Sequence, residues 1–274
     1  VSPTGSLAEA VRGAAWLIFA VPSHAARSVL QQLSSLLSSP IPLLSATKGI
    51  EEETLKLMTQ VMQDTLPPSF HHSVAVLSGP SFAAEVCHGH PTAVTLAGED
   101  PELVRLLQGW LMTPAFRVYG GTDLIGVQLG GALKNVMAIA AGVVDGLGLG
   151  HNARAALITR GLAEMIRLGV AMGAAPHTFY GLSGMGDLVL TCTGPLSRNY
   201  TVGVRLGQGG SLPAILKDMR AVAEGVRTSR AALGLAARYG VEMPIVREVC
   251  AVLFDGKPCR RAVADLMERG PKEE

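Results

Sequence analysis

The stretch LIGVQLGGALKNVMAIAAGVV, residues 124–144, divides the chain into two parts with different sequence patterns, and Lys134 is its single charged residue. Its length and apolar character predict a long buried helix. Burial disfavours the charged form of an ammonium group and lowers its pKa. Such a lysine is typical of proton transfer or anion binding. The alternative is a lysine whose methylene stem packs while its ammonium group reaches water.

The residues before this stretch alternate apolar runs of strand length with helix-like segments. This alternation predicts a mostly parallel sheet with both faces covered, the doubly wound (Rossmann-type) α/β pattern. The expected strands are 14–21, 41–46, 74–79, 92–98 and 116–120, and the expected helices are 7–12, 24–37, 54–65 and 101–112, with a further helix beginning near Ser81.

After Gly121 the strand-like patterns nearly vanish. We therefore expect the remainder of a dinucleotide-binding domain over residues 1–120, with an incomplete doubly wound parallel sheet, and an all-helical substrate and catalytic domain over residues 121–274. The expected helices of this second part are 123–145, 152–173, 175–181, 186–192, 198–207, 211–219, 224–239, 244–254 and 259–268.

Composition and charge exclude several classes of protein. The net charge is +1 and the basic residues form no dense stripe, so we expect no nucleic-acid partner. The four cysteines form no C-x-x-C pair, which favours reduced thiols in a cytoplasmic protein. The seven histidines lack metal-ligand spacing, so we expect no metal. The apolar run contains Gln128 and Asn135 and lacks interfacial aromatics, so we expect no membrane span.

The dinucleotide fingerprint G-x-G-x-x-G is missing from the sequence. The nearest glycine clusters, 146–150 and 184–186, follow helical or loop sequence, whereas the fingerprint follows the first strand of a doubly wound sheet. Either the chain is not a dinucleotide fold, or about 60 residues, the length of two βα units, precede Val1.

Two loops follow expected strands, and ligands bind at the carboxyl ends of strands in open α/β sheets. Lys48 follows the strand 41–46 and suits a phosphate or carboxylate; the alternative is a solvated loop lysine. Gly79 and Ser81 lie where a helix begins, and free N–H groups there attract anions or polar ligand atoms. The alternative is an ordinary Gly-Pro turn with Ser81 as the helix cap.

Three polar positions in the helical half are further candidates. Asp187 follows a glycine-rich turn and either caps a helix or pairs with Lys134 or a substrate hydroxyl. Arg198, in the segment SRNY (197–200), lies in the first turn of a helix, where a cation is unfavourable unless an anion binds there. Glu224 either bonds a nucleotide or is an ordinary acidic residue in a first helical turn.

Six segments together resemble the NAD(P)-dependent glycerol-3-phosphate dehydrogenase family of bacterial type, in order and in approximate spacing. They are AVPSHAARSVL (20–30), SATKGIE (45–51), LSGPSFAAEV (77–86), GVQLGGALKNVMAIAAGVVDGLGLGHNARAALITRGLAEM (126–165), YGLSGMGDLVLTCTGPLSRNYTVG (180–203) and AVAEGVRT (221–228). The lysine helix and the SRNY segment are the specific parts. One departure is Gln128, where the family usually has Glu.

The resemblance implies an enzyme that interconverts sn-glycerol 3-phosphate and dihydroxyacetone phosphate with NAD or NADP, for glycerophospholipid synthesis. Lys134 would be the catalytic proton donor and acceptor. We also expect a cytoplasmic homodimer and a glycine-rich segment before Val1. The implied substrate contacts are Lys48, Gly79, Ser81, Lys134, Asp187, Ser197, Arg198 and Asn199, and the implied cofactor contacts are Lys48, Ala83, Arg198, Val222 and Glu224.

Two other interpretations are weighed against this one. The first is a 3-hydroxy acid dehydrogenase of the same architecture, and the SRNY segment argues against it because it suits a phosphate. The second is a catalytically inactive fragment or a nucleotide-sensing protein. The retained Lys134 argues against a sensor, and the missing glycine loop favours a fragment.

Overall fold

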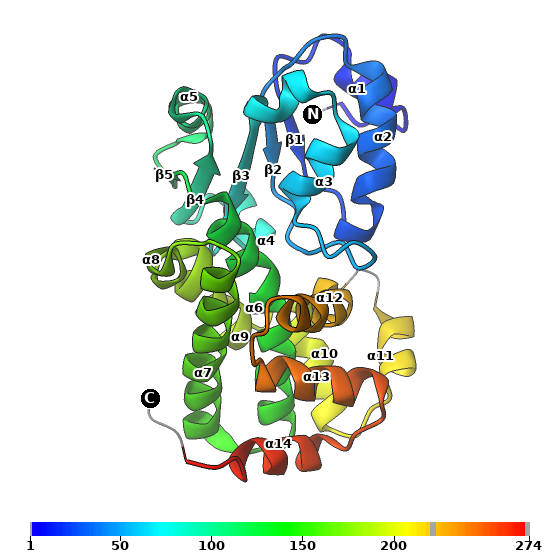
Figure 1. The fold of residues 1–274 in the computed structure, drawn as a ribbon, viewed down its shortest axis with the longest axis vertical. Helices are drawn as coiled ribbons and strands as arrows, with labels where there is room; N and C mark the ends of the chain where they lie inside the picture. Colours follow the sequence, from blue (N-terminus) through cyan, green and yellow to red (C-terminus); the bar gives the residue numbers. More distant parts are fainter. Residues whose placement is uncertain (1, 220–222, 272–274) are drawn as a thin grey trace.

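The first part of the chain forms a five-stranded sheet, shown at the top of Figure 1. The computed structural model describes residues 2–219 and 223–271. The strands lie side by side in chain order. They are β1 (Leu17–Phe19), β2 (Leu43–Ser45), β3 (Val74–Ser78), β4 (Thr92–Gly98) and β5 (Phe116–Gly121).

The sheet is mostly parallel, as predicted, with one exception. The pairs β1–β2, β2–β3 and β4–β5 are parallel, but β3 and β4 are antiparallel, with Ala75 opposite Gly98 and Ser78 opposite Thr95. The connection between β3 and β4 contains only the short helix α4 (Ala83–Cys87), which buries no residue. A parallel crossover needs a connection that packs on the sheet face. Because α4 does not pack there, β4 returns antiparallel to β3.

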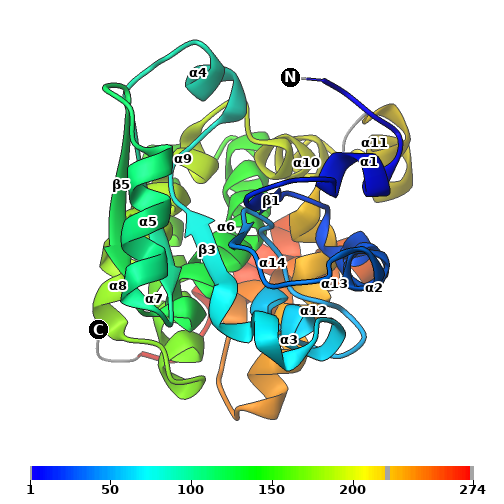
Figure 2. The same cartoon turned by 90° about the horizontal axis from the view of Figure 1, so that it is seen from above.

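Helices cover both faces of the sheet. Leu43 packs with α2 (Ala26–Leu36) and α3 (Met58–Thr65), whereas Leu44 packs with α5 (Pro101–Leu111). Successive residues of a strand point to opposite faces, so these helices lie on opposite sides of β2. Seen from above, α5 lies beside β5, and α2 and α3 lie toward the other end of the sheet (Figure 2). Two short helices, η1 (Ser23–Ala25) and η2 (Pro68–Ser73), and helix α1 (Leu7–Val11) complete this part.

Two expected elements in this part differ from the structure by more than two residues at an end. The helix expected over 54–65 begins only at Met58, because Leu55 adopts a left-handed conformation (φ 61°) and an Ile50–Leu57 bridge closes a turn before it. The strand expected over 14–21 is limited to Leu17–Phe19. It pairs with β2 alone, and β2 offers only three partners.

The second part is helical, and none of the described residues after Gly121 lies in a strand. Its centre is α6 (Leu124–Gly146), which runs through the molecule in Figure 1. The most apolar 18-residue window of α6 is 94% buried inside the protein, so α6 is a core helix. Around it lie α7 (Gly150–Ala171), α8 (Pro176–Tyr180), η3 (Leu182–Gly186), α9 (Asp187–Thr193), α10 (Arg198–Gly207), α11 (Leu212–Asp218), α12 (Glu224–Arg238), α13 (Pro244–Phe254) and α14 (Cys259–Met267).

Helices α6 and α10 pack backbone against backbone through glycines. A Cβ atom on Gly142 of α6 would lie 2.1 Å from the Tyr200 carbonyl oxygen, and one on Gly203 of α10 would lie 2.0 Å from the Ile139 carbonyl oxygen. These distances are far shorter than any carbon–oxygen contact, so the two helices could not approach this closely with side chains in between. The contact fixes α10, and with it residues 197–199, against the helix that carries Lys134.

We predict that Gly203→Ala destabilises the protein by about 1–3 kcal/mol or more, because the added methyl group overpacks the contact. The matched control is Gly109→Ala in α5, where the added Cβ atom meets nothing within 4 Å. That control should stabilise the protein by up to about 1 kcal/mol through helix propensity. Urea unfolding measures both changes, and equal effects of the two substitutions would contradict the proposed backbone contact.

Candidate functional site

Asp187 forms ion pairs with two lysines that come from different parts of the fold. Its oxygen Oδ2 lies 2.7 Å from Nζ of Lys48, and its oxygen Oδ1 accepts a short hydrogen bond from Nζ of Lys134. The carboxylate is completely buried, with 0% of Asp187 exposed. A buried charge is tolerated when it is paired and hydrogen-bonded, and here one carboxylate compensates two ammonium groups.

Three elements place these groups. Lys48 follows the carboxyl end of β2, Lys134 lies in the middle of α6, and Asp187 is the first residue of α9. Helix η3 continues directly into α9, and the backbone N–H of Asp187 donates to the carbonyl oxygens of Leu182 and Gly184. The turn of η3 that leads to Asp187 approaches α6 closely, because a Cβ atom on Gly130 would lie 2.3 Å from the Ser183 carbonyl oxygen. This close approach brings Asp187 within reach of Lys134.

Lys134 has one further partner, Thr191, which the sequence analysis did not single out. Its Nζ donates to the hydroxyl of Thr191 at 2.9 Å, and that hydroxyl donates to the backbone oxygen of Asp187 at 2.6 Å. Thr191 is four residues after Asp187 in α9, so both side chains lie on one helix face. An ammonium group has three N–H donors. Asp187 and Thr191 take two of them, and no other described residue takes the third, which is left for another oxygen.

Burial lowers the pKa of Lys134 to about 8. Desolvation is the largest cause, and the positive charge of Lys48 adds to it, while Asp187 acts in the opposite direction. Desolvation prevails because the whole amine is removed from water. A lysine with a pKa near 8 can both give and take a proton under ordinary conditions.

Lys48 connects this cluster to the loop after β3. Its Nζ donates to the carbonyl oxygen of Gly79 at 3.0 Å, and the hydroxyl of Ser81 donates to the same oxygen at 3.0 Å. Gly79 has φ 144°, and a Cβ atom there would lie 2.9 Å from Cα of Val94, so only glycine fits. The neighbouring hydroxyl of Ser78 is buried and has no hydrogen-bond partner among the described residues.

The start of α10 presents the residues of the SRNY segment. Ser197 caps the helix by accepting from the Tyr200 N–H at 3.2 Å. Arg198 is exposed and forms no ion pair with a described residue. Asn199 is buried, and its amide donates to Oδ1 of Asn135, the neighbour of Lys134, at 2.9 Å. The first turn of α10 is therefore linked directly to the lysine helix.

Two of the remaining predicted cofactor contacts, Glu224 and Ala83, lie in the described part of the chain. Both oxygens of the Glu224 carboxylate accept hydrogen bonds from Ser23, at 3.3 Å from the backbone N–H and 2.6 Å from the hydroxyl. Ala83 is the exposed first residue of α4 and offers only its backbone there. Val222 lies outside the described residues.

Taken together, the structure brings Lys48, Lys134, Asp187, Gly79 and Ser81 into one connected cluster. It links Asn199 to the same helix through Asn135, and it places Arg198 beside Asn199 without a contact to the lysines. Within residues 2–219 and 223–271, His, Cys, Asp and Glu form no group that could hold a metal ion.

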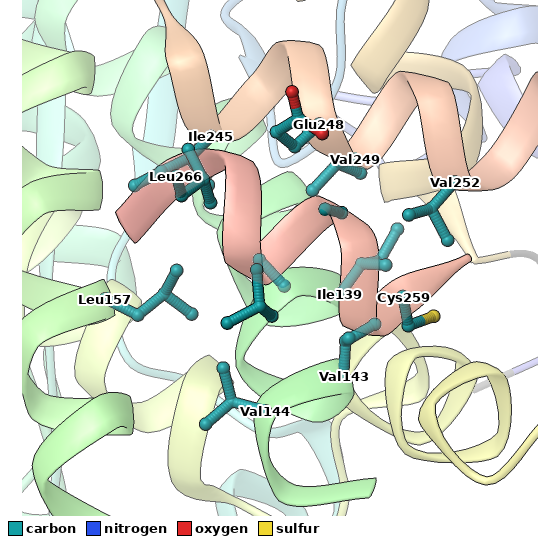
Figure 3. Close-up of a pocket in the computed structure, with 13 residues that line it drawn as sticks. Ile139, Val143, Val144, Leu157, Ile245, Glu248, Val249, Val252, Cys259 and Leu266 are labelled. Atoms are coloured by element: carbon teal, nitrogen blue, oxygen red, sulfur yellow. The ribbon is translucent and has the colours of Figure 1, made fainter. Parts of the chain in front are cut away.

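A separate apolar cavity of about 40 Å³ lies between α6, α7, α13 and α14 (Figure 3). Its walls are mainly aliphatic, with Ile139, Val143, Val249 and Leu266 among them, and Glu248 lies at its side. None of its lining residues belongs to the cluster of Lys48, Lys134 and Asp187, so this cavity is separate from the candidate site.

Comparison with known proteins gives matches over nearly the whole chain. Residues 1–104 match the family model "NAD-dependent glycerol-3-phosphate dehydrogenase N-terminus", and residues 123–264 match "NAD-dependent glycerol-3-phosphate dehydrogenase C-terminus". A glycerol-3-phosphate dehydrogenase [NAD(P)+] of Geobacter sulfurreducens is 57% identical over 274 residues, which are 100% of this chain and 82% of that protein. A glycerol-3-phosphate dehydrogenase [NAD(P)+] of Myxococcus xanthus is 54% identical over 100% of this chain and 82% of that protein.

Solved structures are similar as well. A glycerol-3-phosphate dehydrogenase from Coxiella burnetii has a TM-score of 0.91 and 38% identity, over 96% of this chain and 80% of that one. Glycerol-3-phosphate dehydrogenase GPD1 from Saccharomyces cerevisiae has a TM-score of 0.82 and 26% identity, over 97% of this chain and 79% of that one. A D-mandelate dehydrogenase in complex with NADH, at 13% identity and a TM-score of 0.57, shares only the fold.

We predict that Asp187→Asn destabilises the protein by about 3–5 kcal/mol near pH 6.5, because two ammonium groups lose their buried carboxylate. At pH values above its pKa of about 8, Lys134 is already neutral in the parent protein. The loss of stability caused by Asp187→Asn should therefore be smaller near pH 9. The control is Asp218→Asn, which removes an exposed ion pair with Arg205 and should cost at most about 1 kcal/mol. A pH-independent loss in urea unfolding would contradict the pairing with Lys134.

Proposed function

Because the chain belongs to the NAD-dependent glycerol-3-phosphate dehydrogenase family, we propose that Lys134, Lys48 and Asp187 form the reacting centre of its active site. The chain is an NAD(P)-dependent oxidoreductase that interconverts sn-glycerol 3-phosphate and dihydroxyacetone phosphate. The observation that carries the proposed site is a buried lysine with a lowered pKa, held by Asp187 and Thr191, that keeps one N–H free.

In the reducing direction, the carbonyl oxygen of dihydroxyacetone phosphate gains negative charge as C2 accepts a hydride. The free N–H of Lys134 donates to that oxygen and then transfers its proton to it. Asp187 holds the ammonium group in place, and Thr191 fixes its direction. In the oxidising direction, neutral Lys134 removes the hydroxyl proton of glycerol 3-phosphate. A pKa of about 8 makes both forms of the lysine accessible.

The polar groups at the carboxyl edge of the sheet fit the reactive end of a dinucleotide. The edge carries the half-exposed Lys48, the glycine backbone at Gly79 and the unpartnered buried hydroxyl of Ser78. NAD or NADP, when bound, supplies or accepts the hydride. Lys48 would contact both cofactor and substrate, and Gly79 and Ser81 would line the substrate site. Ala83, Arg198, Val222 and Glu224 would contact the cofactor.

The start of α10 suits the phosphate group of the substrate. Arg198 is exposed in the first turn of the helix, where a positive side chain is unfavourable without an anion. The free N–H groups of that turn and an arginine fork both bind phosphate. Ser197 caps the turn and Asn199 holds it against α6, so the proposed phosphate site has a fixed position relative to Lys134.

A phosphate site also bears on the alternative substrate. A 3-hydroxy acid dehydrogenase shares the general architecture, and an arginine also binds the carboxylate of such a substrate. The match to glycerol-3-phosphate dehydrogenases over the whole chain favours the phosphorylated substrate. A nucleotide sensor would need no buried lysine poised for proton transfer, so this alternative leaves a costly feature of the site without a purpose.

Three wider aspects are proposed from the resemblance to the family. The product would enter glycerophospholipid synthesis, and the enzyme would work as a cytoplasmic homodimer. The four cysteines are all free thiols, which supports a reducing compartment. Residues 1–120 would serve the dinucleotide and residues 121–274 the substrate and the chemistry.

We predict that Lys134→Ala lowers turnover by about 100-fold or more, as for loss of a general acid–base. In the parent enzyme, the reduction rate should fall as pH rises through about 8, since it needs the ammonium form, and the oxidation rate should rise through the same pH. The variant should lose this inflection and keep its dinucleotide affinity, measured by calorimetry. Near-normal turnover would mean that the lysine only packs.

We predict that Arg198→Ala lowers kcat/KM for glycerol 3-phosphate far more than for glycerol. The expected difference is about 2–3 kcal/mol, as for hydrogen bonds to a charged group. The matched control is Arg205→Ala at the other end of α10, where the arginine pairs with Asp218. If Arg198→Ala leaves the ratio of the two kcat/KM values unchanged, the phosphate binds elsewhere.

A further inference from the structure

Ser23 and Glu224 join the two parts of the molecule. Ser23 begins η1 directly after β1 and is 2% exposed, and Glu224 begins α12, 201 residues later. The serine donates its backbone N–H to one carboxylate oxygen and its hydroxyl to the other. Two hydrogen bonds to one carboxylate fix both its position and its orientation.

The surrounding backbone is built closely around this pair. A Cβ atom on Gly49, in the loop after β2, would lie 2.6 Å from Cβ of Ser23 and 3.2 Å from Oε2 of Glu224. The ends of β1 and β2 and the start of α12 therefore meet at one point, and a larger residue at position 49 would separate them. Figure 1 shows α12 on the side of the helical part that faces the sheet.

Hydrogen bonds continue from Glu224 to the reacting centre. The N–H of Gly225, the next residue, donates to Oδ1 of Asn199 at 2.9 Å, and the amide of Asn199 donates to Asn135 at 2.9 Å. Asn135 follows Lys134 in α6. This series connects the carboxyl end of β1 with the start of α10 and with the lysine helix, at the boundary where cofactor and substrate must meet.

We propose that Ser23 is a positioning residue for the dehydrogenase reaction: by holding the Glu224 carboxylate, it sets the sheet edge against the helices that carry Lys134 and Arg198. The inference rests on the proposed function. Hydride transfer requires the reacting atoms to lie about 3–3.5 Å apart, so an enzyme that binds cofactor on one part and substrate on another needs a defined spacing. Ser23 supplies this spacing before either ligand binds.

The kinetic test compares the whole chain with Ser23→Ala. Loss of the hydroxyl should lower kcat about 10-fold, as for one hydrogen bond to a charged group, because the spacing of the reacting atoms is no longer set in advance. It should also raise KM for the dinucleotide, because the Glu224 carboxylate is no longer held. The pH midpoint of turnover should not move, because Ser23 does not contact Lys134. The control is Ser28→Ala in α2, whose hydroxyl donates to the Ala25 carbonyl oxygen at the end of η1 and forms no hydrogen bond with Glu224 in the described part of the chain.

A double-mutant cycle with Glu224→Gln tests whether Ser23 acts through that carboxylate. If it does, Ser23→Ala should have little further effect in the Glu224→Gln background. Additive effects, or a Ser23→Ala enzyme equal to Ser28→Ala, would overturn the proposal. A lower KM in Ser23→Ala would overturn it too, since the pair would then compete with the nucleotide.

Hydrogen exchange without ligands separates this inference from the proposed function. Ser23→Ala should speed amide exchange at the start of α12, 201 residues away in sequence, and Ser28→Ala should not. If the parent chain has no dehydrogenase activity, the proposed function is contradicted, even when Ser23→Ala changes amide exchange as expected. An active parent chain with neither a kcat or KM change nor an exchange change in Ser23→Ala would contradict the role of Ser23 alone.

Discussion

The carboxylate of Asp187, buried between two ammonium groups, is the interaction on which the arrangement of the site depends. One buried carboxylate with two lysines leaves a net positive charge in a largely buried region, which is unfavourable unless the partners are placed well. The fold meets this condition by directing three elements to one point: the end of β2, the middle of α6 and the start of α9. Burial, with the positive charge of Lys48 added to it, keeps the pKa of Lys134 low, and the excess positive charge makes the region attractive to an anionic substrate.

Most of the fold could be predicted from local sequence patterns. The helical part was predictable because its helices are amphipathic or continuously apolar and end at glycines or begin at prolines. The antiparallel pairing of β3 and β4 was not, because it depends on whether the segment 79–91 packs on the sheet, and short segments around Gly79 and α4 give no periodic signal for this. The late start of α3 depends on a left-handed Leu55, which propensity does not indicate.

Whether a site residue could be predicted from the sequence depended on the chemistry of its side chain. Lys134 was recognisable because a charge in an apolar helix breaks the local pattern. Asp187 had two interpretations in the sequence, helix cap and ion-pair partner. In the structure it is the ion-pair partner of two lysines, whereas no side chain caps α9, whose preceding residue is Gly186. Thr191 and Ser23 gave no signal, because hydroxyl residues are tolerated almost everywhere and the partner of Ser23 lies 201 residues away.

The glycine contact between α6 and α10 has a consequence for how such a protein can diversify. Where two helix backbones touch at Gly142 and Gly203, there are no side chains whose size could be adjusted to shift one helix relative to the other. New substrate preferences would therefore have to arise in the segments that lead into the helices, such as η3 and the residues before Ser197. Recombination or redesign that exchanged α10 without α6 would disrupt this helix packing, so the two helices can be exchanged only as a pair.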